Sequence, residues 1–300
     1  MSTGLPVVKM NGLGNAIAVV DLRGGHAPLT TAEARRLAEP AAGLGFDQIM
    51  ALHDGAGDVD CFMRIYNSDG SEVSACGNGT RCVADVLFGE GGARRLVLAT
   101  DAGRLICTPG GRPGTVSVDM GVPRLAWNEI PLAHAVPDIR AVAVPLAGVP
   151  GAEAIRGAGL LGPATVVNVG NPHAIFWVAD PDAIDFARLG PVIEHHPLFP
   201  ERVNVSLARI DRPDRITLKV WERGAGLTRA CGTAACATMV AAVLTGRTGR
   251  AATIVLPGGE LDLSWGEDGH ILMTGPTETE ATGVIDRESL AVVLDPARAA

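Results

Sequence analysis

Two cysteines, each followed by glycine, have the residue types and spacing for acid–base chemistry. The first begins the run Cys76-Gly77-Asn78-Gly79-Thr80-Arg81-Cys82, and the second begins Cys231-Gly232-Thr233-Ala234-Ala235-Cys236. Each Cys-Gly pair leads through small residues into an apolar segment that predicts a helix. The two runs stand about half a chain length apart. This spacing indicates a duplicated chain with one reactive thiol in each half.

A cysteine directly before a helix places its sulfur near unpaired N–H groups and the positive end of the helix dipole, which favours the thiolate. The same N–H groups suit a carboxylate. Two such helix starts directed at one amino acid predict inversion of its α-carbon. One thiolate would remove the α-proton, the other thiol would return a proton on the opposite face, and the N–H groups would stabilise the enolate-like charge.

The other cysteines are interpreted as buried packing groups: Cys61, Cys82, Cys107 and Cys236. A zinc site built from Cys76, Cys82, Cys231, Cys236 and His173 is an alternative. However, the cysteine separations of five and four intervening residues fit zinc pairs poorly. No Cys-x-x-Cys redox pair is present. The sequence therefore favours acid–base thiols without a metal.

Composition narrows the class of protein. The chain has 300 residues, 47% hydrophobic and 19% charged, which is enough for two domains with their own cores. The net charge of −8 and the lack of a basic cluster argue against nucleic-acid and membrane partners. Lys9 and Lys219 are the only lysines that could anchor pyridoxal phosphate, so we expect no cofactor. No signal peptide or bilayer-length apolar run is evident, so we expect the cytoplasm.

The elements that must position the thiols are two helices and many short strands. Helices are predicted at 79–88 and 232–244, and the second, without any charge, must be buried on all sides. A short helix through Leu37, capped by Thr30 or Thr31, is also predicted. Strands are predicted at 5–9, 16–22, 46–52, 58–67, 95–99, 104–108, 116–120, 165–169, 174–178, 203–209, 215–221, 252–256, 260–264 and 270–274. The Pro-, Gly- and Ala-rich stretch 121–163 is predicted to connect the halves.

Several separate blocks, in order, resemble the diaminopimelate epimerase family. They are Lys9 to Asn15, Asn67 to Cys82, Gly170 to His173, Val203 to Val205, and Glu222 to Thr233. The resemblance runs from Lys9 to about Pro276, with departures at Asn11, Ala16 and Ile17. It implies an α+β fold of two similar halves, each a curved mixed sheet wrapped around a central apolar helix, with the active site in the cleft between them. The expected halves are 1–122, rejoined by 275–300, and 123–274.

The resemblance also implies an activity and residue roles. The activity is cofactor-independent conversion of LL- to meso-diaminopimelate, in lysine and peptidoglycan precursor supply, by a homodimer acting on a small amino acid. Cys76 and Cys231 would be the catalytic acid and base, supported electrostatically by His173 and Glu222. Gly77, Asn78, Gly232 and Thr233 would bind the carboxylate at the reacting centre. The other implied substrate-binding residues are Asn15, Gln48, Asn67, Asn171, Asn204, Glu222 and Arg223.

Two rival functions stay open at this point. A proline-racemase-like enzyme would share the thiol pair, but that group typically has His where Asn78 stands. The Glu222-Arg223 pair also suits a substrate with a second charged end. A thiol-based, redox-sensing binding protein would use the same pocket without turnover. Exchange of the substrate α-hydrogen separates an enzyme from a binding protein.

Overall fold

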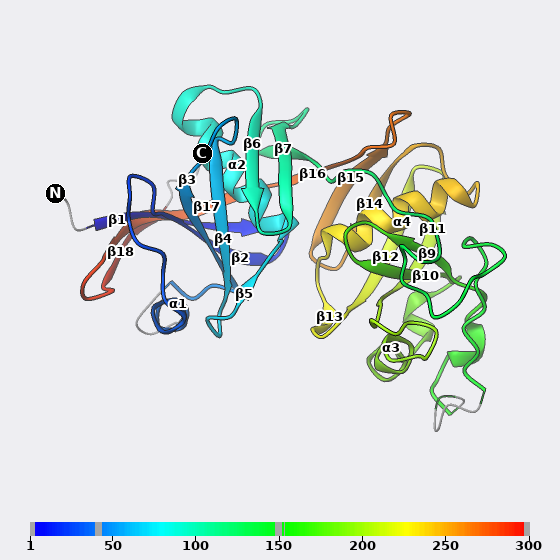
Figure 1. The fold of residues 1–300 in the computed structure, drawn as a ribbon. Helices are drawn as coiled ribbons and strands as arrows, with labels where there is room; N and C mark the ends of the chain where they lie inside the picture. Colours follow the sequence, from blue (N-terminus) through cyan, green and yellow to red (C-terminus); the bar gives the residue numbers. More distant parts are fainter. Residues whose placement is uncertain (1–3, 40–43, 148–151, 153, 297–300) are drawn as a thin grey trace. The chain divides into compact units, whose positions relative to one another are not determined.

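The computed structural model describes residues 4–39, 44–147, 152 and 154–296, and the chain forms two compact units. Unit 1 comprises 1–119 and 274–300, and unit 2 comprises 120–273. In each unit, strands pack around one principal helix, α2 (Gly77–Gly91) in unit 1 and α4 (Gly232–Leu244) in unit 2 (Figure 1). β16 (Ile271–Pro276) carries the chain from unit 2 back into unit 1. Among the described residues, no helix has the length and apolar character needed to cross a membrane.

Unit 1 contains a mixed sheet with the strand order β8-β7-β6-β4-β3-β2-β1-β17-β18. A short strand, β5, also pairs with β4. The helix α1 (Thr31–Ala38) lies between β2 and β3 in the sequence and is capped by Thr30. The strands are β1 (Gly4–Gly12), β2 (Asn15–Asp21), β3 (Gln48–Asp54), β4 (Cys61–Asn67), β5 (Glu72–Val73), β6 (Leu96–Thr100), β7 (Gly103–Pro109), β8 (Thr115–Asp119), β17 (Glu278–Asp286) and β18 (Val292–Pro296).

Unit 2 contains a mixed sheet with the order β9-β10-β11-β12-β14-β15, and β13 pairs with β12. The helix α3 (Phe186–Glu194) follows β10, and two 3₁₀ turns cover Ala158–Leu160 and Pro181–Ala183. The strands are β9 (Thr165–Asn168), β10 (Pro172–Trp177), β11 (Asn204–Arg212), β12 (Arg215–Glu222), β13 (Gly226–Thr228), β14 (Ala251–Leu256) and β15 (Gly259–Trp265).

The two units repeat one topology. The successive pairings from β1 to β7 are antiparallel, parallel, antiparallel, parallel and antiparallel. Those from β9 to β15 follow the same series. In both units a helix follows the second strand, and the Cys-Gly helix follows a short strand paired with the fourth strand. The prediction of two similar α+β halves around apolar helices is confirmed.

Both Cys-Gly helices are deeply buried, as their composition predicts. In α4 every residue from Ala234 to Ala242 is buried. In α2 a Cβ added at Gly79 would lie 2.1 Å from the Cε atom of Met50, so the helix start packs directly on the Met50 side chain of β3. The four cysteines predicted to be packing groups, Cys61, Cys82, Cys107 and Cys236, are buried. Burial raises the pKa of Cys61 to about 11 and the pKa values of Cys82 and Cys107 to about 12.

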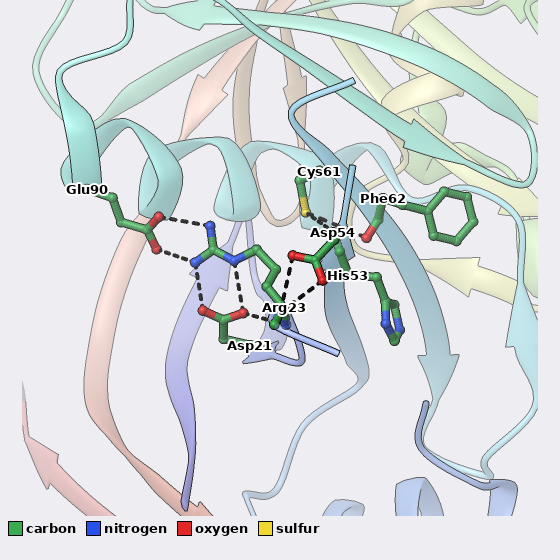
Figure 2. Close-up of polar contacts among 8 residues, drawn as sticks. Asp21, Arg23, His53, Asp54, Cys61, Phe62 and Glu90 are labelled. Carbon is green, nitrogen blue, oxygen red and sulfur yellow. Dashed lines mark hydrogen bonds and ion pairs between the residues drawn. The ribbon is translucent and has the colours of Figure 1, made fainter. Parts of the chain in front are cut away.

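Arg23 forms hydrogen bonds that connect the C-terminal end of α2 to the sheet (Figure 2). The guanidinium of Arg23, just after β2, donates to Asp21 with an Nη2–Oδ2 distance of 2.6 Å. It also donates to both oxygens of Glu90, in the last turn of α2, at 2.8 and 3.0 Å. These side chains are partly exposed, so each ion pair contributes up to about 1 kcal/mol. Their consequence is positional: the end of α2 opposite Cys76 is fixed against β2.

The Pro-, Gly- and Ala-rich stretch 121–163 differs from its prediction as a simple connection. Ile130, Leu132 and Val142 lie in the core cluster of unit 2, together with Phe176 and Leu189. Spaced apolar side chains within an irregular backbone therefore cover part of this core. Residues 148–151 and 153 lie outside the described part of the chain.

Candidate active site

The polar residues predicted in the first half meet at one edge of the sheet of unit 1. Asn15 begins β2, Gln48 begins β3, and Asn67 ends β4. Because β2 and β3 are parallel and β4 is antiparallel to β3, these three ends coincide. Gln48 and Asn67 are direct partners in the register, and Gln48 Nε2 donates to Asn67 Oδ1 at 3.0 Å. The two carboxamides are therefore fixed relative to each other.

The first loop is built by residues at which the sequence departs from the family pattern. Asn11 Oδ1 accepts a hydrogen bond from the Gly14 N–H at 2.7 Å. Asp47 Oδ2 accepts from the Ala16 N–H at 2.9 Å. These two bonds flank Asn15 on both sides. Asn11 and Ala16 thus participate in a loop that holds Asn15 at the start of β2.

Cys76 is the N-cap residue of α2, as predicted. Its Sγ accepts a hydrogen bond from the Gly79 N–H at 3.3 Å, and Gly77 is the first helical residue. The next residue, Asn78, is 6% exposed. The start of the helix packs closely on the first loop, because a Cβ added at Gly12 would lie 3.2 Å from the carbonyl oxygen of Asn78. Unit 1 therefore brings the thiol-bearing helix start beside the loop that carries Asn15.

Arg81 is a buried charge at this helix start whose position the sequence motif alone does not explain. Its side chain is 0% exposed, and Nη2 donates to Asn78 Oδ1 at 2.9 Å. The carboxamide oxygen of Asn78 is thus occupied by Arg81. The orientation of the Asn78 amide is fixed as a result, with its NH₂ group directed elsewhere.

Sheet register in unit 2 produces a second row of polar side chains. His173 of β10 is paired with Asn204 of β11. Val205 is paired with Trp221 of β12, and one further step in this antiparallel register places Asn204 opposite Glu222. His173, Asn204 and Glu222 therefore lie side by side on three neighbouring strands. They occupy the place in unit 2 that Gln48 and Asn67 occupy in unit 1.

Cys231 is the N-cap residue of α4 and lies at this row. It is 6% exposed, and its Sγ is 3.4 Å from the Oγ1 of Thr233. Burial raises the pKa of the Cys231 thiol well above its ordinary value, and the nearby Glu222 carboxylate raises it further. The helix start by itself favours a thiolate, but at Cys231 desolvation and the Glu222 carboxylate act in the opposite direction and favour the neutral thiol.

Backbone and side-chain contacts hold the remaining predicted residues of unit 2. Asn204 Nδ2 donates to the Pro172 carbonyl at 3.0 Å, and Asn204 Oδ1 accepts from the Arg223 N–H at 3.0 Å. The Arg223 side chain donates from Nη1 to the Glu201 carbonyl at 2.9 Å. Arg223 and Glu201 also line a polar cavity of about 330 Å³ in unit 2. Gly232, the first residue of α4, faces the sulfur of Met273.

His173 is fully buried and carries no positive charge at neutral pH. Its Nε2 lies 2.8 Å from Asn171 Oδ1, while Nδ1 has no hydrogen-bond partner among the described residues. Burial, and then the positive charge of Arg223, lower the pKa of His173 to about 3. Any support that this residue gives a thiol is therefore by a neutral ring and not by an imidazolium.

His173 should make the stability of the protein depend on pH. In the unfolded chain its pKa is near 6.5, so between about pH 6.5 and about pH 3 the unfolded state binds a proton that the folded state does not. Stability from this group is complete above about pH 6.5 and falls by about 1.4 kcal/mol per pH unit below it. At pH 5 the loss is about 2 kcal/mol. We expect His173→Gln to remove this part of the pH dependence.

Urea unfolding at pH 7.5 and pH 5 measures this effect. His134→Gln is the matched control, since His134 is exposed and bonds only to its neighbouring carbonyl among the described contacts. The control should keep the wild-type pH dependence. An equal loss of stability on acidification in wild type and His173→Gln would contradict the buried neutral histidine.

Each unit thus gathers its own half of the predicted residues at one sheet edge beside one N-cap cysteine. Unit 1 holds Cys76, Gly77, Asn78, Asn15, Gln48 and Asn67, and unit 2 holds Cys231, Gly232, Thr233, Asn171, His173, Asn204, Glu222 and Arg223. Two residues outside the predicted set join them: Arg81, which bonds to Asn78, and Glu194, which bonds to Trp221 and Gly224 on either side of the Glu222-Arg223 pair. Their signal in the sequence is weak, because each becomes notable only through its burial.

Comparison with known proteins identifies the family. The family model described as diaminopimelate epimerase matches residues 7–126 and 165–280. The diaminopimelate epimerase of Methylocella silvestris is 54% identical over 275 residues, covering 91% of this chain and 92% of its own length. That of Rhodospirillum centenum is 49% identical over 287 residues, covering 94% and 93%.

Solved structures share the fold at low sequence identity. A phenazine biosynthesis protein of the PhzF family from Bacillus anthracis matches with a TM-score of 0.67 at 16% identity, covering 94% of this chain and 99% of that one. A hydroxyproline epimerase from Agrobacterium vitis matches with a TM-score of 0.60 at 15% identity, covering 96% and 93%. These two show the architecture alone. The family model and the close relatives go further, and by them the chain belongs to the diaminopimelate epimerase family.

Proposed function

We propose that this protein interconverts LL- and meso-diaminopimelate by inverting one α-carbon, in the supply of lysine and peptidoglycan precursors. One observation carries the proposal: Cys76 and Cys231 are N-cap residues of equivalent helices in a duplicated fold. The identity of the substrate is taken from the relatives named diaminopimelate epimerase, which match more than nine-tenths of the chain. The substrate is accordingly a small amino acid.

The reaction needs one thiolate and one thiol on opposite faces of the same α-carbon. We place Cys76 on one face and Cys231 on the other. Because burial and Glu222 favour the neutral form of the Cys231 thiol, we assign Cys231 as the proton donor and Cys76 as the base that removes the α-proton. Once Cys231 has given up its proton, its thiolate lies next to a carboxylate. That repulsion favours return of a proton to Cys231, and once Cys76 has also released the proton that it took up, the enzyme is ready for another turnover in the same direction.

The carboxylate on the reacting carbon is proposed to bind between the starts of α2 and α4. The first N–H groups of a helix have no partner within the helix and suit an anion. Gly77, Asn78, Gly232 and Thr233 supply these groups. As the α-proton leaves, negative charge moves onto the carboxylate oxygens, and the N–H groups stabilise it without a cofactor.

The distal amino-acid end is proposed to bind the polar residues of the sheet edges. Arg223 suits the distal carboxylate as a guanidinium fork, and Asn15, Asn67, Asn171 and Asn204 supply amide donors and acceptors. Gln48 holds the carboxamide of Asn67 in place. A substrate with one charged end would leave Arg223 unused. This favours diaminopimelate over proline as substrate.

We also propose three properties that the sequence and the family resemblance lead us to expect. The enzyme acts without pyridoxal phosphate or a metal, works in the cytoplasm, and forms a homodimer. The division of the chain into 1–122, rejoined by 275–300, and 123–274 is proposed to create a cleft in which the two thiols meet.

Incubation in deuterium oxide tests the function. With LL-diaminopimelate we expect meso product that carries deuterium at the inverted carbon, and with proline in a parallel reaction we expect no exchange. Exchange with proline in place of diaminopimelate would favour a proline-racemase-like enzyme. Tight binding of diaminopimelate without any exchange would leave only a binding protein.

A further inference from the structure

Glu194 is a buried carboxylate outside the predicted set of site residues. It is the last residue of α3, and its side chain is 4% exposed. The C-terminal end of a helix is the end at which the dipole disfavours a negative charge, and burial of a carboxylate carries a desolvation cost. Such a residue is stable only when strong donors satisfy it. The identity of those donors shows what Glu194 holds in place.

Both oxygens of Glu194 accept hydrogen bonds from the turn that carries Glu222 and Arg223. Oε2 accepts from the indole Nε1 of Trp221 at 2.7 Å. Oε1 accepts from the Gly224 N–H at 3.0 Å. The Arg202 Nη1 group lies 3.5 Å from Oε1, on a side chain that is 52% exposed. The shorter bonds are thus to residues directly before and directly after the Glu222-Arg223 pair.

The helix α3 also makes a close steric contact with the same indole. A Cβ added at Gly190 would lie 2.4 Å from Cδ2 of Trp221. Glycine inside a helix costs about 1 kcal/mol relative to alanine, so its presence here has a packing reason. It lets the backbone of α3 lie against the indole. Trp221 is therefore fixed by its ring face and by its N–H group.

The turn itself is held at successive N–H groups. The Arg223 N–H donates to Asn204 Oδ1 and the Gly224 N–H donates to Glu194, both at 3.0 Å. The Ala225 N–H closes the turn on the Glu222 carbonyl at 3.1 Å. Gly224 has a φ of +79°, the left-handed conformation that glycine adopts without strain. The backbone from 222 to 225 thus has little freedom while Glu194 is in place.

Unit 1 has an aromatic anchor at the equivalent position. Tyr66 is the next-to-last residue of β4, as Trp221 is of β12. Its hydroxyl donates to the Leu29 carbonyl, just before α1, at 3.0 Å. In both units, therefore, the segment between the second and third strands binds the polar atom of an aromatic residue. In unit 1 this residue is Tyr66, which precedes the site residue Asn67. In unit 2 it is Trp221, which precedes the site residue Glu222.

We infer that Glu194 is a positioning residue of the active site, which holds Glu222 against Cys231 and Arg223 toward the distal end of the substrate through Trp221 and the 222–225 turn. The roles of Glu222 and Arg223 rest on the proposed function. The position of the turn does not rest on it. A loss of Glu194 should therefore change both turnover and the environment of the Cys231 thiol in the absence of substrate.

Glu194→Gln tests this with almost no change in shape. The amide can accept from one donor, but its NH₂ group then faces the other donor. We expect kcat/KM for LL-diaminopimelate to fall by about 10- to 100-fold, the scale of a misplaced site group, with part of the effect in KM because Arg223 moves. The thiol of Cys231 faces Glu222 and the Thr233 hydroxyl, so release of the turn should lower the pH midpoint of its alkylation by iodoacetamide.

The control is Glu33→Gln. Glu33 makes the capping box of α1 and pairs with Arg287 in unit 1, so the same chemical change disturbs a helix far along the chain from the 222–225 turn. It should lower the melting temperature but leave kcat/KM within about twofold and the Cys231 alkylation midpoint unchanged. This separates positioning from a general loss of stability.

Trp221→Phe provides a second variant that keeps the ring and removes only the N–H donor. We expect a downward shift of the alkylation midpoint no larger than that of Glu194→Gln, because the Gly224 bond to Glu194 remains. In the double variant we expect a loss no greater than that of Glu194→Gln alone, because the bond between Trp221 and Glu194 is already disturbed there. A wild-type kcat/KM and a wild-type alkylation midpoint in Glu194→Gln would overturn the inference, as would an equal effect of Glu33→Gln. If the wild-type protein does not invert diaminopimelate, the proposed function fails, and the alkylation midpoint still decides the role of Glu194.

Discussion

Serine in place of either Cys76 or Cys231 is expected to lower the rate of inversion by about 10³-fold or more, near the upper range for a general acid or base. A serine hydroxyl does not ionise near neutral pH, so each variant loses proton transfer on one face of the α-carbon. The remaining thiol still reaches its own face. In deuterium oxide, each variant should therefore exchange the α-hydrogen of one stereoisomer with retention of configuration. The two variants should differ in which isomer, LL or meso, they exchange.

Nuclear magnetic resonance of the α-hydrogen measures exchange, and chiral chromatography measures inversion in the same sample. Cys107→Ala is the control, because Cys107 is buried in β7 of unit 1 and burial raises its pKa to about 12. It should keep inversion within about twofold of wild type per folded molecule. The two-thiol mechanism is wrong if a serine variant keeps more than a tenth of the wild-type inversion rate, or if both variants exchange the same isomer.

The thiol-bearing helices could be predicted from the sequence because their signals are local. The Cys-Gly pairs mark the N-caps, and the uncharged run after Gly232 requires burial on all sides. The half-length repeat of this motif also predicted two similar halves. The pairing directions of the two units, which match step by step, confirm it.

Elements without a continuous pattern were not predicted. The helix α3 contains Gly190 and Pro191, which read as a turn in the sequence. In the structure, Gly190 is required by the contact with Trp221. The last strands, β17 and β18, were also missed. β17 carries exposed Thr and Glu side chains over its first half, so its alternation is weak, and its pairing with β1 joins the two ends of the chain.

The protonation of Cys231 could not be read from its own motif. The N-cap position is visible in the sequence and favours a thiolate. Burial and Glu222 act in the opposite direction and prevail. Glu222 reaches this thiol because β12 pairs with β11 in one particular register, and such pairing between distant segments is not encoded in any short run of residues. The same holds for the row of His173, Asn204 and Glu222.

Arg223→Ala is expected to weaken binding of diaminopimelate by about 2–5 kcal/mol, the range for breaking a buried charge pair. The proposed partner of the guanidinium is the distal carboxylate of the substrate. The substitution leaves the Arg223 N–H free to keep its bond to Asn204, and Gly224 keeps its bond to Glu194, so the turn should persist. The lost interaction is then that of the side chain, which in the free protein bonds to the Glu201 carbonyl.

Calorimetric titration in a Cys76→Ser background measures this binding without inversion of the ligand. A ligand of the same chain length that lacks the distal carboxylate and amine should bind Arg223→Ala and the parent with similar affinity, because Arg223 is expected to contact only the distal end.

Arg209→Ala is the control: Arg209 lies on β11 but pairs with Asp211 near the other end of that strand. It should change the dissociation constant by less than about twofold, since an exposed ion pair contributes little. A dissociation constant for Arg223→Ala within threefold of the parent would mean that another residue binds the distal carboxylate. In that case Arg124, which lines the same polar cavity as Arg223, would be the alternative cation.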